Sequence, residues 1–185
     1  MEITATIQKK KESRKKVEGQ KSLSGKRIGI FGKGGSGKST CAVLLAKGLS
    51  NEGYHVCLLD ADSTNLGLEK ALGINRTPVS LLEYFGGMVF SGGAVTCPVD
   101  DPTRLPGAEI SIDSLPTQYY GQDDAITLLI AGKIGDQGPG AGCDGPISKI
   151  TRDLHVTIGG QPTVTVIDFK AGFEDIARGA ITSLD

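Results

Sequence analysis

One stretch near the start of the chain limits the possible folds more than any other. Residues 28–31 are a short run that favours β structure, residues 32–39 fit the pattern G-x-x-x-x-G-K-[ST], and a helix-like run follows. Glycines in such a loop let backbone N–H groups turn toward phosphate oxygens. The helix after them directs its positive end at the same anion. We therefore expect Lys38 to reach the β- and γ-phosphates of a nucleotide and the Ser39 hydroxyl to bind Mg²⁺.

The same loop also fits the dinucleotide fingerprint G-x-G-x-x-G, and Asp60 follows where a ribose-binding acid would be expected. The Lys38–Ser39 pair favours the phosphate loop, because a hydride-transfer enzyme needs neither a lysine nor a metal-binding hydroxyl there. A glycine turn without a ligand is the third alternative. On the favoured interpretation, the residues that hold the nucleotide are Gly34, Gly35, Ser36, Gly37, Lys38, Ser39 and Thr40.

Charge divides the chain of 185 residues into two parts. Residues 1–27 contain nine Lys or Arg and three Glu, whereas the net charge of the whole chain is -1. We expect residues 1–26 to be a basic, disordered tail, because they show no apolar periodicity, and residues 27–185 to form one P-loop NTPase domain. The tail could contact nucleic acid or acidic lipid, but no aromatic residues interleave its charges, so a solvated extension is favoured.

The sequence gives no strong indication of a membrane or nucleic-acid partner. No signal peptide or membrane-spanning run is visible. The four cysteines have no regular spacing, which argues against a disulfide framework. We therefore expect a cytoplasmic protein.

Three apolar runs indicate buried parallel strands, at residues 55–60, 125–131 and 163–168. The carboxyl ends of such strands meet at the edge where ligands bind, which would bring Asp60, Asp62 and Asp168 beside the loop. Asp168 has the place of a Walker B aspartate and, with Asp62, would support Mg²⁺. Asp60 would orient an attacking water, and Gly172 would present an N–H to the γ-phosphate. An acidic turn that caps the next helix is the alternative for Asp60 and Asp62.

These runs alternate with helical patterns at residues 39–51, 65–73, 80–85, 147–154 and 173–184. We therefore predict an α/β fold, a three-layer P-loop NTPase with a mostly parallel central sheet. Residues 95–115 are rich in proline and loops, with one strand near Ile110. Because no strand follows the helix after Asp168, we expect a domain cut short at its C-terminal side and lacking the segment that recognises the base.

The Lys-Gly-Gly-x-Gly-Lys-Ser-Thr run, which begins at Lys33, resembles the deviant Walker A motif of the MinD/ParA/nitrogenase iron protein group. The resemblance covers roughly residues 27–185. It implies a homodimer that encloses two ATP molecules, with Lys33 acting on the partner's nucleotide. It also implies catalytic roles for Lys33, Lys38 and Asp60, with closure on ATP binding and release after hydrolysis.

Within that group, residues 131–134 leading to residues 142–143, and residues 166–179, look like CooC-type ATPases. The resemblance implies a role in inserting nickel into carbon monoxide dehydrogenase or a related client metalloenzyme. The sequence departs from that pattern, because Cys143 is the one cysteine where two closely spaced ones are usual. Nickel or zinc held by Cys143 at a dimer interface and a structural thiol therefore remain alternatives, and Cys97 shows no partner in the sequence.

Three functions follow from the resemblance. The first is an ATPase of metalloenzyme maturation. The second is a positioning or partition ATPase of the MinD/ParA kind, which the basic tail would suit. The third is an iron–sulfur reductase like the nitrogenase iron protein, which would need two further cysteines. The first is preferred.

Overall fold

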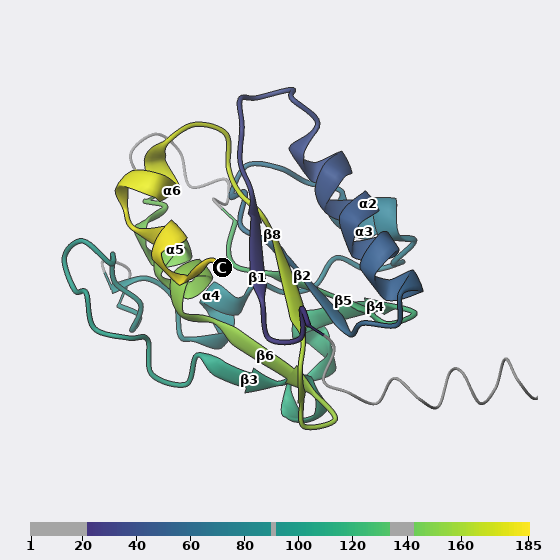
Figure 1. The fold of residues 1–185 in the computed structure, drawn as a ribbon. Coiled ribbons are helices and arrows are strands. Elements are labelled where there is room, and N and C mark those ends of the chain that lie inside the picture. Colours follow the sequence, from purple (N-terminus) through teal and green to yellow (C-terminus); the bar gives the residue numbers. More distant parts are fainter. Residues whose placement is uncertain (1–21, 90–91, 134–142) are drawn as a thin grey trace, which may run out of the picture.

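The fold is built on one five-stranded sheet (Figure 1). A computed structural model describes residues 22–89, 92–133 and 143–185. The order of the strands is β1 (Arg27–Ile30), β8 (Val164–Asp168), β2 (Val56–Asp60), β5 (Ile126–Ile130) and β4 (Tyr120–Asp123). The first four are parallel, and β4 runs antiparallel to β5 at one edge. Every residue of β2, β5 and β8 is buried, as expected for strands covered on both faces.

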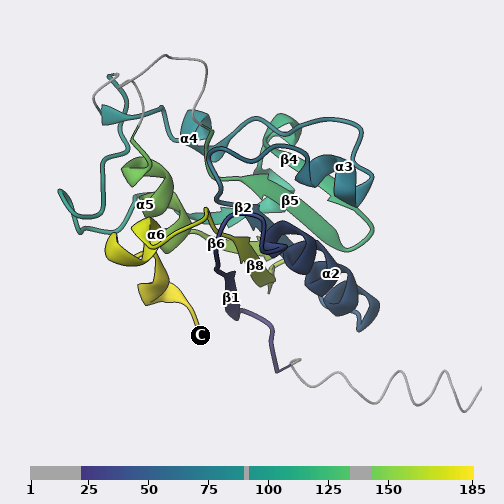
Figure 2. The ribbon, with the colours of Figure 1, turned by 90° about the horizontal axis from the view of Figure 1, so that it is seen from above.

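Helices cover both faces of this sheet. On one face lie α2 (Lys38–Asn51) and α3 (Leu68–Leu72), and on the other lie α4 (Leu81–Tyr84), α5 (Gly145–Asp153) and α6 (Glu174–Ala177) (Figures 1 and 2). The core is correspondingly divided into two apolar clusters. In β2, Val56 and Leu58 belong to the cluster with α2, whereas Cys57 and Leu59 belong to the other. The predicted three-layer α/β fold with a mostly parallel sheet is confirmed.

A second, smaller sheet lies below the first in Figure 1. It has the order β3 (Glu109–Ser111), β6 (His155–Ile158) and β7 (Gln161–Pro162). β3 is the strand expected near Ile110, whereas β4, β6 and β7 were not expected from the sequence. Short 3₁₀ helices lie at Ile112–Ser114, Thr117–Tyr119 and Ala180–Ser183.

Two predicted helices differ from those observed. The helix expected over residues 173–184 ends at Ala177 in α6 and resumes as a 3₁₀ helix at Ala180, because Gly179 between them has a left-handed φ of 75°. The helix expected over residues 65–73 begins only at Leu68, because Gly67 before it has a φ of 108°.

The described part of the predicted tail, residues 22–26, contacts the domain. Leu23 packs against the apolar cluster beside α2, and the Gly25 N–H donates to the Thr163 carbonyl at 3.0 Å. Residues 1–21 and the glycine-rich residues 134–142 lie outside the described part, so the expectations that fall on them remain predictions. In the described residues, no helix is long and apolar enough to cross a membrane.

Candidate functional site

The loop between β1 and α2 has the backbone shape that its glycines predict. Gly35 and Gly37 have backbone φ values of 74° and 84°, which residues other than glycine rarely adopt. Gly37 is also the N-cap of α2. At Gly32 a Cβ would lie 2.8 Å from the Ser36 hydroxyl. Residues 34–37 are exposed, so their backbone is open to a ligand at the helix N-terminus.

The two lysines of the loop lie in different surroundings. Lys38 is buried, with 9% of its surface exposed, and its Nζ donates to the Lys33 carbonyl at 3.3 Å. The Ser36 hydroxyl donates to the same carbonyl at 2.8 Å. Lys33 itself is exposed. The Lys38 ammonium group is therefore held against its own loop, whereas Lys33 is open to solvent.

Two of the predicted carboxylates end neighbouring strands. Asp60 of β2 and Asp168 of β8 are register partners at the carboxyl edge of the sheet. Asp168 is fully buried, and neither of its carboxylate oxygens has a hydrogen-bond partner among the described residues. Burial raises the pKa of Asp168, and the neighbouring Ser39 hydroxyl opposes the rise.

The surroundings of Asp168 fit Mg²⁺. Buried carboxylate oxygens without a partner are costly unless a cation or a donor reaches them. The Ser39 side chain and Asp168 supply the hard oxygen ligands that Mg²⁺ prefers. Lys38 is also close enough to Asp168 to act on its charge. The chemistry of these residues therefore fits a metal-bound phosphate group.

Asp60 is held by Lys133, a residue that the sequence did not single out for the site. The Lys133 Nζ lies 2.6 Å from Oδ2 of Asp60 and donates, also at 2.6 Å, to the carbonyls of Asp62 and Asn65. Oδ1 of Asp60 accepts from the Asp62 N–H at 3.1 Å. Burial raises the pKa of Asp60 to about 6, although Lys133 opposes that rise. Both carboxylate oxygens are thus engaged in this conformation.

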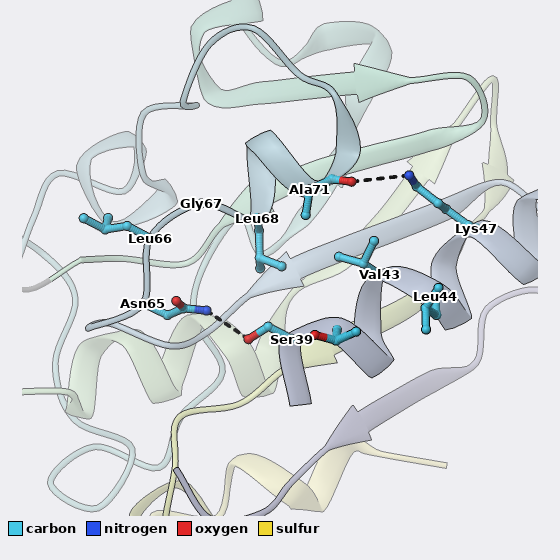
Figure 3. A pocket seen from close by; sticks show the side chains of 10 residues that line it. Ser39, Val43, Leu44, Lys47, Asn65, Leu66, Gly67, Leu68 and Ala71 are labelled. Atoms are coloured by element: carbon cyan, nitrogen blue, oxygen red, sulfur yellow. Dashed lines mark hydrogen bonds between the residues drawn. The ribbon is translucent and has the colours of Figure 1, made fainter. Parts of the chain in front are cut away.

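Asp62 stabilises the turn after β2. Its Oδ1 accepts from the backbone and hydroxyl of Thr64, at 2.9 and 2.7 Å, and from the Asn65 N–H at 3.2 Å. Asp62 thus stabilises a local turn, but it does not cap α3, whose N-cap is Gly67 without a side-chain cap. The Asn65 side chain in turn donates to the Ser39 hydroxyl at 2.9 Å (Figure 3). The turn is therefore connected to the predicted Mg²⁺ ligand.

A hollow of about 340 Å³ lies between α2 and α3, beside that hydrogen bond (Figure 3). The side chains of Leu44 and Leu66 at its border are 64% and 77% exposed. The residues that line it are Ser39, Thr40, Val43, Leu44, Lys47, Asn65, Leu66, Gly67, Leu68 and Ala71. The hollow adjoins the first turn of α2, whereas the glycines of the loop do not line it.

Gly172 and Cys143, two further residues predicted for the site, lie in different surroundings. Gly172 lies against the phosphate loop, where its N–H donates to the Gly32 carbonyl at 3.4 Å. The Cys143 Sγ accepts from the Gly145 N–H and from Arg178, both at 3.4 Å. Within the described residues, no group of three or more His, Cys, Asp or Glu side chains is placed to hold a metal.

Sequence similarity to known proteins provides evidence independent of this geometry. The family model described as "ParA: NUBPL iron-transfer P-loop NTPase" matches residues 26–86. An uncharacterised ATP-binding protein of Methanocaldococcus jannaschii is 38% identical over 83% of this chain and 61% of its own length. The carbon monoxide dehydrogenase accessory protein CooC of Rhodospirillum rubrum is 31% identical over 86% of this chain and 60% of its own. The chain thus spans about three fifths of these relatives.

A solved structure has a weaker similarity. The septum site-determining protein MinD of Pyrococcus horikoshii aligns with 85% of this chain and 54% of its own, at 20% identity and a TM-score of 0.48. That similarity is too low to add to the argument.

The phosphate loop, the parallel sheet and the carboxylates at its edge define a P-loop NTPase. Within that class, the loop motif with its second lysine and the sequence relatives indicate one group. The chain resembles the MinD/ParA-type P-loop NTPases and is similar to the CooC ATPases. The resemblance drawn from the sequence is therefore confirmed.

Proposed function

We propose that this chain is the nucleotide-binding part of an ATP-hydrolysing dimerisation switch, which helps to assemble the metal site of a carbon monoxide dehydrogenase-type enzyme in the cytoplasm. The observation that carries the ATPase part is the buried Asp168 carboxylate, which lies beside Ser39 and Lys38 and whose oxygens have no hydrogen-bond partner in the described part of the chain. The sequence similarity to CooC supports the maturation part.

Each group of the site has a defined task in this proposal. Backbone N–H groups of residues 34–37 bind the phosphates, and Lys38 neutralises charge on them. Ser39 and Asp168, with Asp62 beside them, hold Mg²⁺, which would supply charge neutralisation at the phosphate oxygens. The N–H of Gly172 would turn from Gly32 toward the terminal phosphate.

Lys33 acts between two copies of the chain. Its exposed side chain is free to cross an interface, unlike Lys38, which is buried over its own loop. A cation supplied by a partner stabilises the charge of the transferred phosphoryl group in the same way as an arginine finger. Hydrolysis in this scheme therefore requires the homodimer.

Asp60 is the group that accepts hydrogen from the attacking water. Its Oδ2 is paired with Lys133 in the present conformation. For Asp60 to receive a water, Lys133 has to share or release that oxygen. The same movement would free the carbonyls of Asp62 and Asn65, and so it would couple hydrolysis to the turn after β2.

Dimerisation on ATP tests the switch. Light scattering after gel filtration should show a dimer with Mg²⁺ and a slowly hydrolysed ATP analogue, and a monomer with Mg-ADP. Lys33→Ala should bind nucleotide as a monomer and dimerise weakly. Lys47→Ala, which changes an exposed lysine of α2, should behave like the unaltered chain. A Lys33→Ala chain that dimerises and hydrolyses ATP normally would refute the proposal.

Metal analysis of protein purified without oxygen tests the maturation part. Nickel or zinc at about one ion per dimer, lost in Cys143→Ala, would support metal held at the dimer interface. An iron–sulfur chromophore would favour a reductase instead. Nucleotide-dependent dimers without metal, and without any effect on a nickel-dependent client enzyme, would favour a positioning ATPase.

A further inference from the structure

Two cysteines that are far apart in the sequence share one cation. Cys97 lies in the loop after the bridge between Met88 and Val95, and Cys143 lies just before Asp144, the N-cap of α5. The Nη1 of Arg178, at the end of α6, lies 3.6 Å from the Cys97 Sγ and 3.4 Å from the Cys143 Sγ. Both sulfur atoms are thus within hydrogen-bonding reach of the same nitrogen.

The absence of a side chain at Gly145 leaves room for Cys97. A Cβ at this position would lie 2.7 Å from both Cβ and Sγ of Cys97, closer than real contacts permit. The Gly145 N–H meanwhile donates to the Cys143 Sγ at 3.4 Å. Cys97 therefore packs against the residue whose backbone contacts Cys143.

Further contacts hold the three segments in place. The Cys97 carbonyl accepts from the N–H groups of Asp100 and Asp101, at 3.1 and 2.9 Å. The Asp101 carboxylate forms an ion pair at 2.7 Å with Lys149, a buried residue of α5. Arg178 is fixed by a second ion pair, to Glu174, at 2.5 Å. The loop with Cys97 is thus tied to the helix that follows Cys143.

We propose that Cys97 and Cys143, with Arg178 between them, form a dithiol that closes to an intramolecular disulfide by exchange with a low-molecular-weight disulfide. One protein thiolate attacks the small disulfide, forms a mixed disulfide and releases one small thiolate. The second protein thiolate attacks the protein sulfur of that mixed disulfide and releases the other. The two protons of the protein thiols end on the two small thiols, so atoms and electrons balance.

The geometry favours this chemistry. The thiolate is the attacking form, and Arg178 places a positive charge at both sulfurs. Both cysteines are partly exposed, so a small disulfide can reach them. The site does not depend on the proposed ATPase function.

The other two cysteines are internal controls. Cys57 is fully buried in β2, and burial raises its pKa to about 12, so it should not react in the folded protein. Cys41 is exposed on α2, so it should form a mixed disulfide that persists. In one sample, the proposal therefore predicts a disulfide between Cys97 and Cys143, a mixed disulfide at Cys41 and no reaction at Cys57.

The experiment treats the reduced chain with oxidised glutathione and maps the products by mass spectrometry of peptides. We expect a Cys97–Cys143 cross-link and a glutathione adduct at Cys41. Cys97→Ser should trap a stable adduct at Cys143, whereas Cys41→Ser should retain the cross-link. Persistent separate adducts at Cys97 and Cys143 in the unaltered chain, or no reaction at either, would overturn the proposal.

The rate of closure tests the role of Arg178. Arg178→Gln should slow formation of the cross-link by about tenfold, because it removes the positive charge that lies within hydrogen-bonding reach of both sulfur atoms. Arg178→Lys should restore part of the rate, and Lys47→Gln, which removes an exposed cation of α2 on the other face of the sheet, should close at the rate of the unaltered chain. Equal rates for Arg178→Gln and the unaltered chain would exclude a role for the guanidinium. Circular dichroism of each variant would confirm that it is folded.

Discussion

Lys133, which follows β5, forms an ion pair at 2.6 Å with Asp60, the last residue of the adjacent strand β2. The same Nζ also binds the carbonyls of Asp62 and Asn65. One side chain therefore holds both the candidate catalytic carboxylate and the turn that follows it. The properties of Asp60 should depend on Lys133 more than on any residue near it in the sequence.

Asp60 should make folding stability depend on pH. Its pKa in the folded chain is raised from 3.8 to about 6. The folded state therefore favours the protonated form, so this contribution to stability is full below about pH 4 and is lost as the pH rises through about 6. The free energy of unfolding of the unaltered chain, minus that of Asp60→Asn, should fall by about 3 kcal/mol across this window. A difference that stays constant with pH in urea titrations would contradict the assignment.

Removal of the Lys133 cation should destabilise the protein most at neutral pH. Lys133→Met leaves a buried, ionised Asp60 without its partner, which should cost about 3 kcal/mol at pH 7. The cost should be smaller near pH 5, where Asp60 takes up a proton. Lys47→Met is the control, because Lys47 is exposed and donates to the Ala71 carbonyl at 3.3 Å. Equal losses of unfolding free energy in the two variants would show that the Lys133–Asp60 ion pair does not stabilise the protein.

Lys38 should determine nucleotide affinity. Lys38→Ala removes the cation held over the phosphate loop and should weaken binding of Mg-ADP by about a hundredfold, as expected for the loss of charged hydrogen bonds. Calorimetry on the folded variant measures this directly. Lys33→Ala should change the affinity of the monomer much less, because Lys33 is exposed to solvent whereas Lys38 is buried beside the loop. Similar losses for both lysines would contradict their different roles.

Asp168 should make nucleotide binding depend on magnesium. The ratio of ADP affinities with and without Mg²⁺ should fall by about tenfold in Asp168→Asn, because a neutral amide is a weaker ligand than a carboxylate. Asp100→Asn, on an exposed turn, should keep the original ratio. If chelation of Mg²⁺ affects Asp168→Asn and the unaltered chain equally, the metal ligand lies elsewhere.

Gly29 and Gly48 should respond to alanine in opposite directions. At Gly29 in β1, a Cβ would lie 2.6 Å from the Phe31 ring and 2.7 Å from Leu184, so Gly29→Ala should lower the free energy of unfolding by about 2 kcal/mol. At Gly48 in α2, no described residue beyond its chain neighbours and the helix's own backbone has a heavy atom within 4 Å of the added methyl. Gly48→Ala should raise stability by about 0.5 kcal/mol. Chemical denaturation of both variants checks the sign of each effect.

The long apolar runs predicted the central sheet because local sequence and tertiary burial agree there. β2, β5 and β8 are buried on both faces, so their sequences are almost continuously apolar. Helix boundaries were less predictable. Gly179 ends α6 and Gly67 delays α3 through left-handed backbone angles, which the helical pattern of the neighbouring residues does not reveal.

The parts of the site that were missed depend on contacts between distant segments. Lys133 and Asp60 are 73 residues apart, and Cys97 and Arg178 are 81 residues apart. No motif or periodicity connects such pairs. The phosphate loop was predictable because its function requires neighbouring residues in a fixed order, whereas Lys133 had no signal beyond the short Ala-Gly-Lys run.

The amide of Asn65 is hydrogen-bonded to the Ser39 hydroxyl, and Leu66 comes next in the chain with 77% of its surface exposed. Any ion that attracts this hydroxyl must therefore compete with the amide or move it. The surface around Leu66 would therefore differ in shape between the form with an ion bound at Ser39 and the form without it. A protein that binds this surface would then distinguish the nucleotide-bound form from the empty form without contacting the nucleotide.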